Sequence, residues 1–313
     1  MSFKKYTSSQ QAILTTLLYS DIFSFPLKKD EFWFFLISNK KVTSQGFDRG
    51  LNSLKKLIVY KSGFYCLKGR EEIITRRRKN YPEFEQKMRR ALWVTQKLSR
   101  IPSLLFVGIS GGLAVGNVTK DDDIDLVVIV KENTLFMSRF LVLIALEIIG
   151  VRRSRNQQYT SDTICVNLLF DETALGWFAK HKDMYTAREI GQIVALFDRN
   201  NTYKRFIHAN KWIGEFLPNV VSSEVDFNHP GKRSAPRIKR FWTSQNDGFG
   251  VKLLINPFFE KFSRWLQLSI IKRHRTNEII ENHILAFHPN DYRIKTLKQL
   301  RLKMRQFGLL TKN

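Results

Sequence analysis

The sequence predicts an α+β protein in which a small mixed sheet with covering helices lies between two largely helical regions. Apolar residues at helical spacing run through the first part of the chain and again from about residue 184 onward. Between these regions, two short apolar runs rich in Val and Ile, 104–109 and 126–130, are typical of neighbouring strands. With 313 residues, 43% of them hydrophobic, the chain is long enough to bury a large core, and we expect two or three domains.

Residues 1–70 are expected to form three helices followed by a hairpin with a glycine turn at 61–63. The apolar side of the third helix would face inward and leave Arg49, Lys55 and Lys56 outside. This order resembles a winged helix–turn–helix, in which the third helix enters the DNA major groove and the wing touches phosphate. We expect these three basic residues either to contact nucleic acid or to form a solvated face of a protein-binding module.

Residues 71–101 are expected to form a connecting helix. It carries Arg76-Arg77-Arg78-Lys79, which is either a phosphate-binding patch or a solvated face, the usual state of a basic run. Pro102 then breaks the helix before the first strand of the sheet.

The segment 102–175 contains the most informative residues. Gly111-Gly112 follows the first strand, and Asp123-Ile124-Asp125 opens the second. Alternate side chains of a strand share a face, so the two carboxylates repel each other unless a divalent cation or a basic group removes the repulsion. Mg²⁺ commonly binds through one or two carboxylates and substrate phosphates. A glycine turn at the start of a helix lets backbone N–H groups approach phosphate oxygens. The combination indicates a site for a metal-bound nucleoside triphosphate.

This segment resembles the nucleotidyltransferase superfamily typified by DNA polymerase beta, whose mark is a Gly-Gly or Gly-Ser turn, a spacer, and Asp-hydrophobic-Asp-hydrophobic. The resemblance implies a nucleotidyltransferase core in which Asp123 and Asp125 bind Mg²⁺ (or Mn²⁺) and act in catalysis. It also implies that a nucleoside triphosphate binds at Ser110, Gly111 and Gly112. The alternative is a surface cluster of aspartates at the end of an edge strand, which explains the charges but not the glycines.

The family usually places a third carboxylate on a later strand, facing the first two. The next strand here offers Asn167 at the inward position, and an amide can give its oxygen to a metal but cannot act as a base. The catalytic base could instead be Glu189 or Asp171. For Glu189, the alternative is a helix-surface carboxylate that pairs with Arg188 or Arg205.

Residues 176–313 are expected to be helical, with a basic linker rich in Pro, Gly and Ser at 219–250. The whole chain resembles bacterial proteins that join a winged helix, a polymerase-beta-like domain and a helical tail. The expected helices lie at about 184–196, 200–216, 256–287 and 291–307.

The charge distribution favours anionic partners. The net charge is +24, and the excess lies in the flanks: 1–100 and 201–313 each hold 21 Lys and Arg against 8 Asp and Glu, whereas 101–200 hold 10 against 12. Such a balance is typical of proteins that bind nucleic acid, nucleotides or acidic surfaces.

The two cysteines, Cys66 and Cys165, each lie in an apolar run and are expected to be buried thiols in a reducing cytoplasm. We expect no transmembrane segment, because the longest apolar stretch, 135–151, is interrupted by charges. The six histidines show no metal-binding spacing.

Two functions therefore remain. In the first, the protein is a Mg²⁺-dependent nucleotidyltransferase that moves a nucleoside monophosphate from a triphosphate to an unidentified hydroxyl. In the second, it is a nucleic-acid-binding regulator whose transferase domain binds nucleotide but is catalytically inactive.

Overall fold

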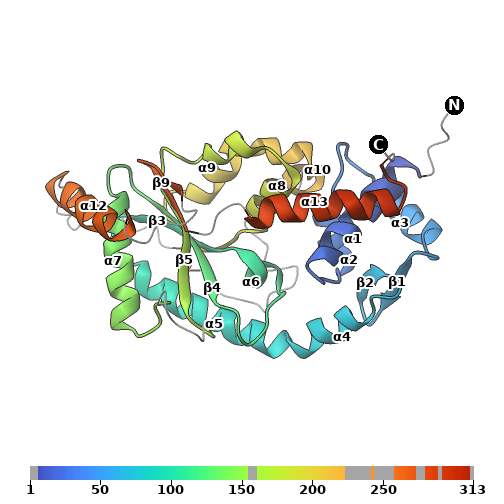
Figure 1. Cartoon of the computed structure of the whole chain (residues 1–313), viewed down its shortest axis with the longest axis horizontal. Coiled ribbons are helices and arrows are strands. Elements are labelled where there is room, and N and C mark those ends of the chain that lie inside the picture. The colour runs from blue at the N-terminus through green and yellow to red at the C-terminus, as the bar shows by residue number, and fades with distance from the viewer. Residues whose placement is uncertain are drawn as a thin grey trace.

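The computed structural model describes residues 6–153, 161–222, 241–242, 257–272, 279–287 and 291–310. In these ranges, helices surround a seven-stranded mixed sheet, and a separate two-stranded hairpin lies near the N-terminal helices (Figure 1). The α+β class predicted from the sequence is confirmed. None of the helices in these ranges is long and apolar enough to cross a membrane.

The N-terminal part forms the three helices and the hairpin that its periodicity predicts. Thr7 caps the first helix: its hydroxyl accepts a hydrogen bond from the Gln10 N–H, and the Gln10 side chain accepts one from the Thr7 N–H. The hairpin turns at Ser62-Gly63, where both residues have the positive φ of the turns favoured in two-residue hairpins. The elements are α1 Ser8–Ile22, α2 Lys29–Phe34, α3 Ser44–Ser53, β1 Ile58–Lys61 and β2 Phe64–Leu67.

The three basic residues singled out on this part are exposed, as expected, but only Arg49 lies on a helix. Because α3 ends at Ser53, Lys55 and Lys56 lie in the turn that leads to β1. The opposite side of α3 packs closely on α1: a Cβ at Gly50 would lie 2.6 Å from Cδ1 of Ile13.

The expectation of one connecting helix is wrong, because the chain forms two helices that meet at Asn80. These are α4, Glu72–Lys79, and α5, Tyr81–Leu98. Pro82 explains the break, since its nitrogen has no hydrogen to donate and its ring would clash with the carbonyl group four residues earlier in a continuous helix. In its actual place, near the start of α5, proline is well tolerated.

The sheet has the strand order β7-β6-β3-β4-β5-β9-β8. Its centre is mixed: β3 runs antiparallel to both β4 and β6, whereas β4 and β5 are parallel. Side chains of β4 alternate between two cores. Leu126 and Val128 pack with α5 and α7, and Val127 and Ile129 pack with the N-terminal helices and with α8 and α9. The bounds are β3 Leu104–Ile109, β4 Ile124–Val130, α7 Leu135–Ile148, β5 Ile164–Asp171, α8 Met184–Gln192, β6 Val194–Asp198 and α9 Thr202–Ala209.

Residues 176–313 were expected to form a helical region with a basic linker at 219–250, but the described part of this region also contains strands. The helix expected to reach about residue 196 ends at Gln192, and β6 follows it and pairs with the central strand β3. The helix expected at 256–287 ends early, and a short hairpin adds to the other edge of the sheet. The helix expected at 200–216 stops at Ala209. Most of the predicted linker, 219–250, lies outside the described residues. The further elements are the short 3₁₀ turns η1 Trp177–His181 and η2 Lys211–Glu215, α10 Pro218–Ser222, β7 Phe241–Trp242, α12 Pro257–Lys272, β8 Ile279–Ile280, β9 Ile284–Ala286 and α13 Asp291–Gln306.

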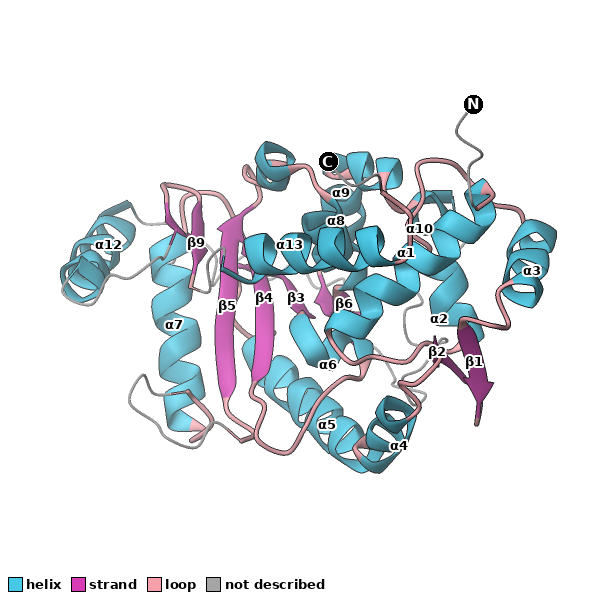
Figure 2. Ribbon diagram, turned by 45° about the vertical axis from the view of Figure 1, so that its right-hand side comes forward, coloured by secondary structure: helices cyan, strands magenta, loops and turns pink. Residues whose placement is uncertain are grey.

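The last helix, α13, returns to the beginning of the chain and lies along α1 (Figures 1 and 2). The two helices are joined by an ion pair of 2.7 Å between Lys303 Nζ and Oδ2 of Asp21. Asp21 also binds Arg70, with 2.6 Å between Oδ1 and Nε. The N-terminal helices, the sheet and the C-terminal helix therefore meet on one side of the molecule, where the candidate site lies.

Candidate functional site

A cavity of about 590 Å³ opens on the face of the sheet that carries Val127. Its walls come from the turn after β3, from β4, β5 and α8, and from α1 and α13 at the two ends of the chain. A volume of this size lies within the usual range of small-molecule sites, about 300–1,000 Å³. The cavity brings together seven residues that the sequence predicted for the site: Ser110, Gly111, Gly112, Asp123, Asp125, Asn167 and Glu189.

The glycine turn packs so closely on its neighbours that there is no room for a side chain at Gly111 or Gly112. Gly111 has φ of +63°, and a Cβ there would lie 3.0 Å from Oδ2 of Asp125. A Cβ at Gly112 would lie 2.6 Å from the carbonyl oxygen of Asn117. The glycines therefore allow the turn to lie directly against the Asp125 carboxylate. The helix that they start, α6 (Gly111–Val115), has only five residues, so any anion would be bound by individual N–H groups of the turn.

Three buried polar atoms around this cavity have no hydrogen-bond partner within the described ranges. They are the hydroxyl oxygens of Ser20 and Ser110 and the Nε of Arg188. These side chains are 2%, 9% and 2% exposed, respectively. Buried polar atoms are nearly always hydrogen-bonded in folded proteins, so three of them around one cavity indicate that it takes a polar ligand or ordered water.

Asp123 and Asp125 both face the cavity, as the alternation along the strand predicts. The guanidinium of Arg153 forms an ion pair with Oδ2 of Asp123. Burial raises the pKa of Asp125 to about 7; the negative charge of Asp123 adds to the rise, and Arg153 opposes it. Arg153 is a basic group that relieves the repulsion between the two carboxylates. It could not be predicted from the sequence, because no spacing pattern connects residues 123 and 153.

The position opposite Asp125 on the neighbouring strand is held by Cys165. β5 pairs with β4 so that Cys165 lies beside Asp125, and the Cys165 Sγ and one carboxylate oxygen from each aspartate lie within 4.8 Å of one another. Burial and the two carboxylates raise the pKa of the Cys165 thiol to about 12. Asn167, two residues further along β5, lines the same cavity.

Asn167 thus lines the cavity, whereas the partly buried Cys165 beside the carboxylates was not predicted from the sequence. The alternation that places Asn167 inward also places inward the residue two positions earlier, and this pattern could have found it.

Glu189 lines the cavity from α8, so the expectation of a helix-surface carboxylate paired with Arg205 is wrong. Arg205 instead binds Glu172, with 2.9 Å between Nη2 and Oε2. Burial raises the pKa of Glu189 to about 7, although neighbouring Arg188 and a hydrogen bond of 3.3 Å from Gln192 oppose the rise. A carboxyl with this pKa can accept a proton near neutral pH.

Asp171, the other candidate base, does not reach the cavity. It lies buried at the far end of β5, where its carboxylate binds Nδ1 of His283 at 2.8 Å and the Thr173 backbone N–H at 2.9 Å. Its hydrogen bonds are consistent with a structural role at the end of the strand.

The basic residues of the N-terminal part are separate from the cavity, and Arg49, Lys55 and Lys56 do not line it. The N-terminal part instead contributes Tyr19, Ser20 and Phe23 to the cavity wall.

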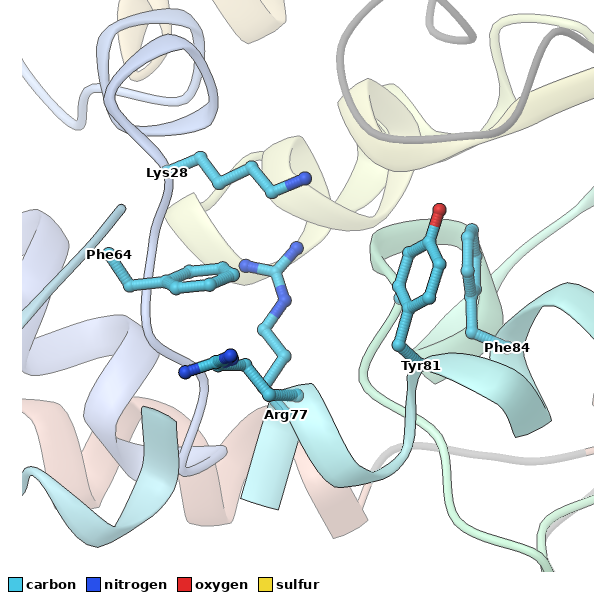
Figure 3. A pocket seen from close by; sticks show the side chains of 7 residues that line it. Lys28, Phe64, Arg77, Tyr81 and Phe84 are labelled. Carbon is cyan, nitrogen blue, oxygen red and sulfur yellow. The ribbon is translucent and has the colours of Figure 1, made fainter. Parts of the chain in front are cut away.

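In the run at 76–79, Arg76, Arg78 and Lys79 are exposed, as expected of a solvated face, but Arg77 is buried. Its guanidinium binds both carboxylate oxygens of Glu31, at 2.6 and 2.7 Å. It also lies 4.1 Å from the centre of the Phe25 ring and 5.0 Å from that of Phe64. Figure 3 shows Arg77 beside Phe64 in a smaller pocket of about 230 Å³, with Tyr81 across from them. This ion pair joins α4 to α2.

No protein-family model, curated protein or solved structure matches the chain. Function must therefore be inferred from the geometry of the site.

Proposed function

We propose that the protein is a nucleotidyltransferase of the polymerase-beta type, dependent on Mg²⁺ or Mn²⁺. The observation that supports this most strongly is the convergence of the glycine turn, Asp123, Asp125 and Glu189 on one cavity of small-molecule size. The close approach of Gly111 to the Asp125 carboxylate fits a turn that holds phosphate next to a metal-binding pair. The unpartnered Ser110 hydroxyl supplies a further donor there.

In this proposal, the β- and γ-phosphates lie against Ser110 and the N–H groups of the glycine turn. Asp123 and Asp125 hold the divalent cation, which when bound neutralises charge on the triphosphate and on the leaving pyrophosphate. Arg153 stays paired with Oδ2 of Asp123, so Oδ1 remains to bind the cation.

Glu189 acts as the base. The acceptor hydroxyl gives its proton to the Glu189 carboxylate, and its oxygen forms a bond to the α-phosphorus. The bond between the α-phosphorus and the bridging oxygen breaks, and pyrophosphate leaves with the electron pair. A pKa of about 7 suits Glu189 to this transfer near neutral pH.

We also propose a winged-helix fold for residues 8–67, because the order of three helices and a hairpin is the one that this fold uses. A nucleotidyltransferase core would then comprise the sheet from β3 to β6, together with the helices on its two faces. The exposed Arg49, Lys55 and Lys56 make nucleic acid a candidate partner of the N-terminal part.

The second candidate is a nucleic-acid-binding regulator with an inactive transferase domain. Two observations favour it: β5 offers Cys165 and Asn167 where the family resemblance implies a carboxylate, and Arg153 already balances Asp123. In that case, the cavity would bind nucleotide without transferring it.

Transfer of label from α-labelled nucleoside triphosphates separates the two candidates. The protein is incubated with each nucleotide and Mg²⁺ or Mn²⁺, and label is sought in protein, RNA and small-molecule fractions. Asp125→Asn should abolish the transfer, whereas Glu132→Gln, at an exposed position just beyond β4, should leave it unchanged. Metal-dependent nucleotide binding without any transfer would favour the second candidate. Nucleotide affinity that ignores both the metal and Asp125→Asn would reject the site assignment.

A further inference from the structure

We propose that Cys165 is the third metal ligand of this site, and that the site therefore prefers cations that accept a thiolate, such as Zn²⁺ and Co²⁺, to Mg²⁺. The inference rests on the proposed function only for the assignment of Asp123 and Asp125 as ligands.

The strand register places the sulfur where a ligand is needed. Cys165 and Asp125 are paired neighbours on parallel strands, so their side chains leave the sheet on the same face. Atoms that share one ion through bonds of about 2.0–2.3 Å lie at most about 4.6 Å apart. The Sγ and the two carboxylate oxygens lie within 4.8 Å of one another, so only a small adjustment is required.

A second observation points to a ligand at the same place. The Ser110 hydroxyl is buried, lines the cavity and has no partner among the described residues. Ser110 is next to Asp125 on the other side of β4, with 3.1 Å between its N–H nitrogen and the Asp125 carbonyl oxygen. The two neighbours of Asp125 across the sheet thus contribute a hydroxyl and a thiol. The hydroxyl is left for a water or a phosphate oxygen that completes the coordination of the cation.

The other cysteine provides the contrast. Cys66 is 2% exposed and packs with the apolar side chains of Phe64, Ile73 and Ile74. Such a thiol behaves as a small apolar residue. Cys165 instead lies beside two carboxylates and the guanidinium of Arg153, so its surroundings are polar and charged.

The donor set decides which cation fits. Mg²⁺ binds oxygen and keeps several waters, whereas a thiolate selects softer ions such as Zn²⁺. Binding forms a metal–sulfur bond and releases the thiol proton to solvent. Cys165→Asp would create a set of three carboxylates, and it should shift the preference toward Mg²⁺.

The test uses the full chain, without nucleotide, in a Cys66→Ser background so that Cys165 is the only thiol. X-ray absorption of the Zn²⁺-loaded protein should show a sulfur neighbour at about 2.3 Å. Co²⁺ should give a thiolate charge-transfer band, and Cys165→Ser should remove the band and weaken Zn²⁺ binding by at least about ten-fold, the scale seen even for second-shell partners. Cys165→Asp should bind Mg²⁺ more tightly than the parent protein.

Zn²⁺ bound without a sulfur neighbour, or a Co²⁺ band that survives Cys165→Ser, would overturn the inference. The absorption measurement needs no variant at position 165, so it holds even if those variants fold poorly. Nucleotidyl transfer with Mg²⁺ and no sulfur ligation would reject the inference and leave the proposed function intact. Sulfur ligation without nucleotidyl transfer would support the inference and reject the proposed transferase activity.

Discussion

Replacing Glu189 by Gln separates the energetic cost of a buried carboxylate from its chemical use. The carboxyl lies on the cavity wall, and among the described residues its ionised form is stabilised by Arg188 and by a long hydrogen bond from Gln192. Burial outweighs both and raises the pKa from 4.5 to about 7. Glutamine has nearly the same shape and cannot ionise, so the substitution removes the charge and little else.

The magnitude follows from the pKa change. Each pKa unit corresponds to about 1.4 kcal/mol, so ionised Glu189 lowers the free energy of unfolding by about 3 kcal/mol. Below pH 4.5, both the folded and the unfolded state hold the proton, and this cost is absent. Between pH 4.5 and about 7, the folded state binds more protons than the unfolded state, so stability falls as the pH rises. Above pH 7, the full cost remains. We therefore expect Glu189→Gln to be more stable than the parent at pH 8 by up to about 3 kcal/mol, and equally stable near pH 4.

Urea unfolding at pH 4, 6 and 8, followed by tryptophan fluorescence, measures this difference, with Glu132→Gln as the exposed control. Transfer activity, where present, should rise through about pH 7 in the parent and fall roughly 10²- to 10⁴-fold in Glu189→Gln. A variant that is less stable than the parent at pH 8 would refute the reasoning, because Glu189 would then be a structural partner of Arg188 and not a strained functional group.

Arg77→Met should lower the free energy of unfolding by about 3–5 kcal/mol, because it leaves buried Glu31 unpaired; a combined Glu31→Leu should restore much of it in thermal or urea melts. Gly111→Ala should cost about 1–2 kcal/mol, since the position has positive φ. It should also weaken metal binding in calorimetry, because the new Cβ pushes on the Asp125 carboxylate. Lys55→Ala with Lys56→Ala should weaken nucleic-acid binding about equally for all sequences, with a reduced salt dependence in fluorescence anisotropy. If duplex DNA, single-stranded DNA and RNA all fail to bind the parent at low salt, nucleic acid is not the partner.

Helices and strands that are determined by residues close together in the chain could be predicted from the sequence. The first three helices and the hairpin follow from apolar spacing and from a glycine turn, and the order of strand, glycine turn and strand follows from residues close together in the chain. By contrast, β6 was missed. Val-Ala-Leu-Phe at 194–197 is a short apolar run that follows a helix closely, and periodicity cannot distinguish such a run from the end of that helix. Its pairing with β3, some ninety residues earlier, decides that it is a strand.

The same distinction applies to the candidate site: residues close together in the chain could be predicted, and residues brought in by tertiary packing could not. The glycines and the two aspartates are a local motif, so they were found from spacing alone. Arg153, Tyr19 and Arg188 reach the cavity only because distant segments pack together, and no spacing rule brings them to it. The fate of Arg77 illustrates the same limit: a run of four basic residues predicts a solvated surface, but the carboxylate of Glu31, brought close by the tertiary fold, draws one of them into the interior.

The cavity belongs to the whole chain and not to the segment that carries the motif. Its wall includes Tyr19 from α1 and Tyr292 from α13, and the ion pair between Asp21 and Lys303 joins these two helices. A fragment limited to 102–175 would keep the glycine turn and both aspartates but would lose Glu189 and β6, the strand that pairs with β3. The Asp125 carboxyl would then be open to water, and the burial that raises its pKa would be gone. The basic N-terminal part is thus also a structural wall of the proposed active site. A substitution in its core that loosens α1 should therefore change the cavity, even if it leaves the exposed lysines untouched.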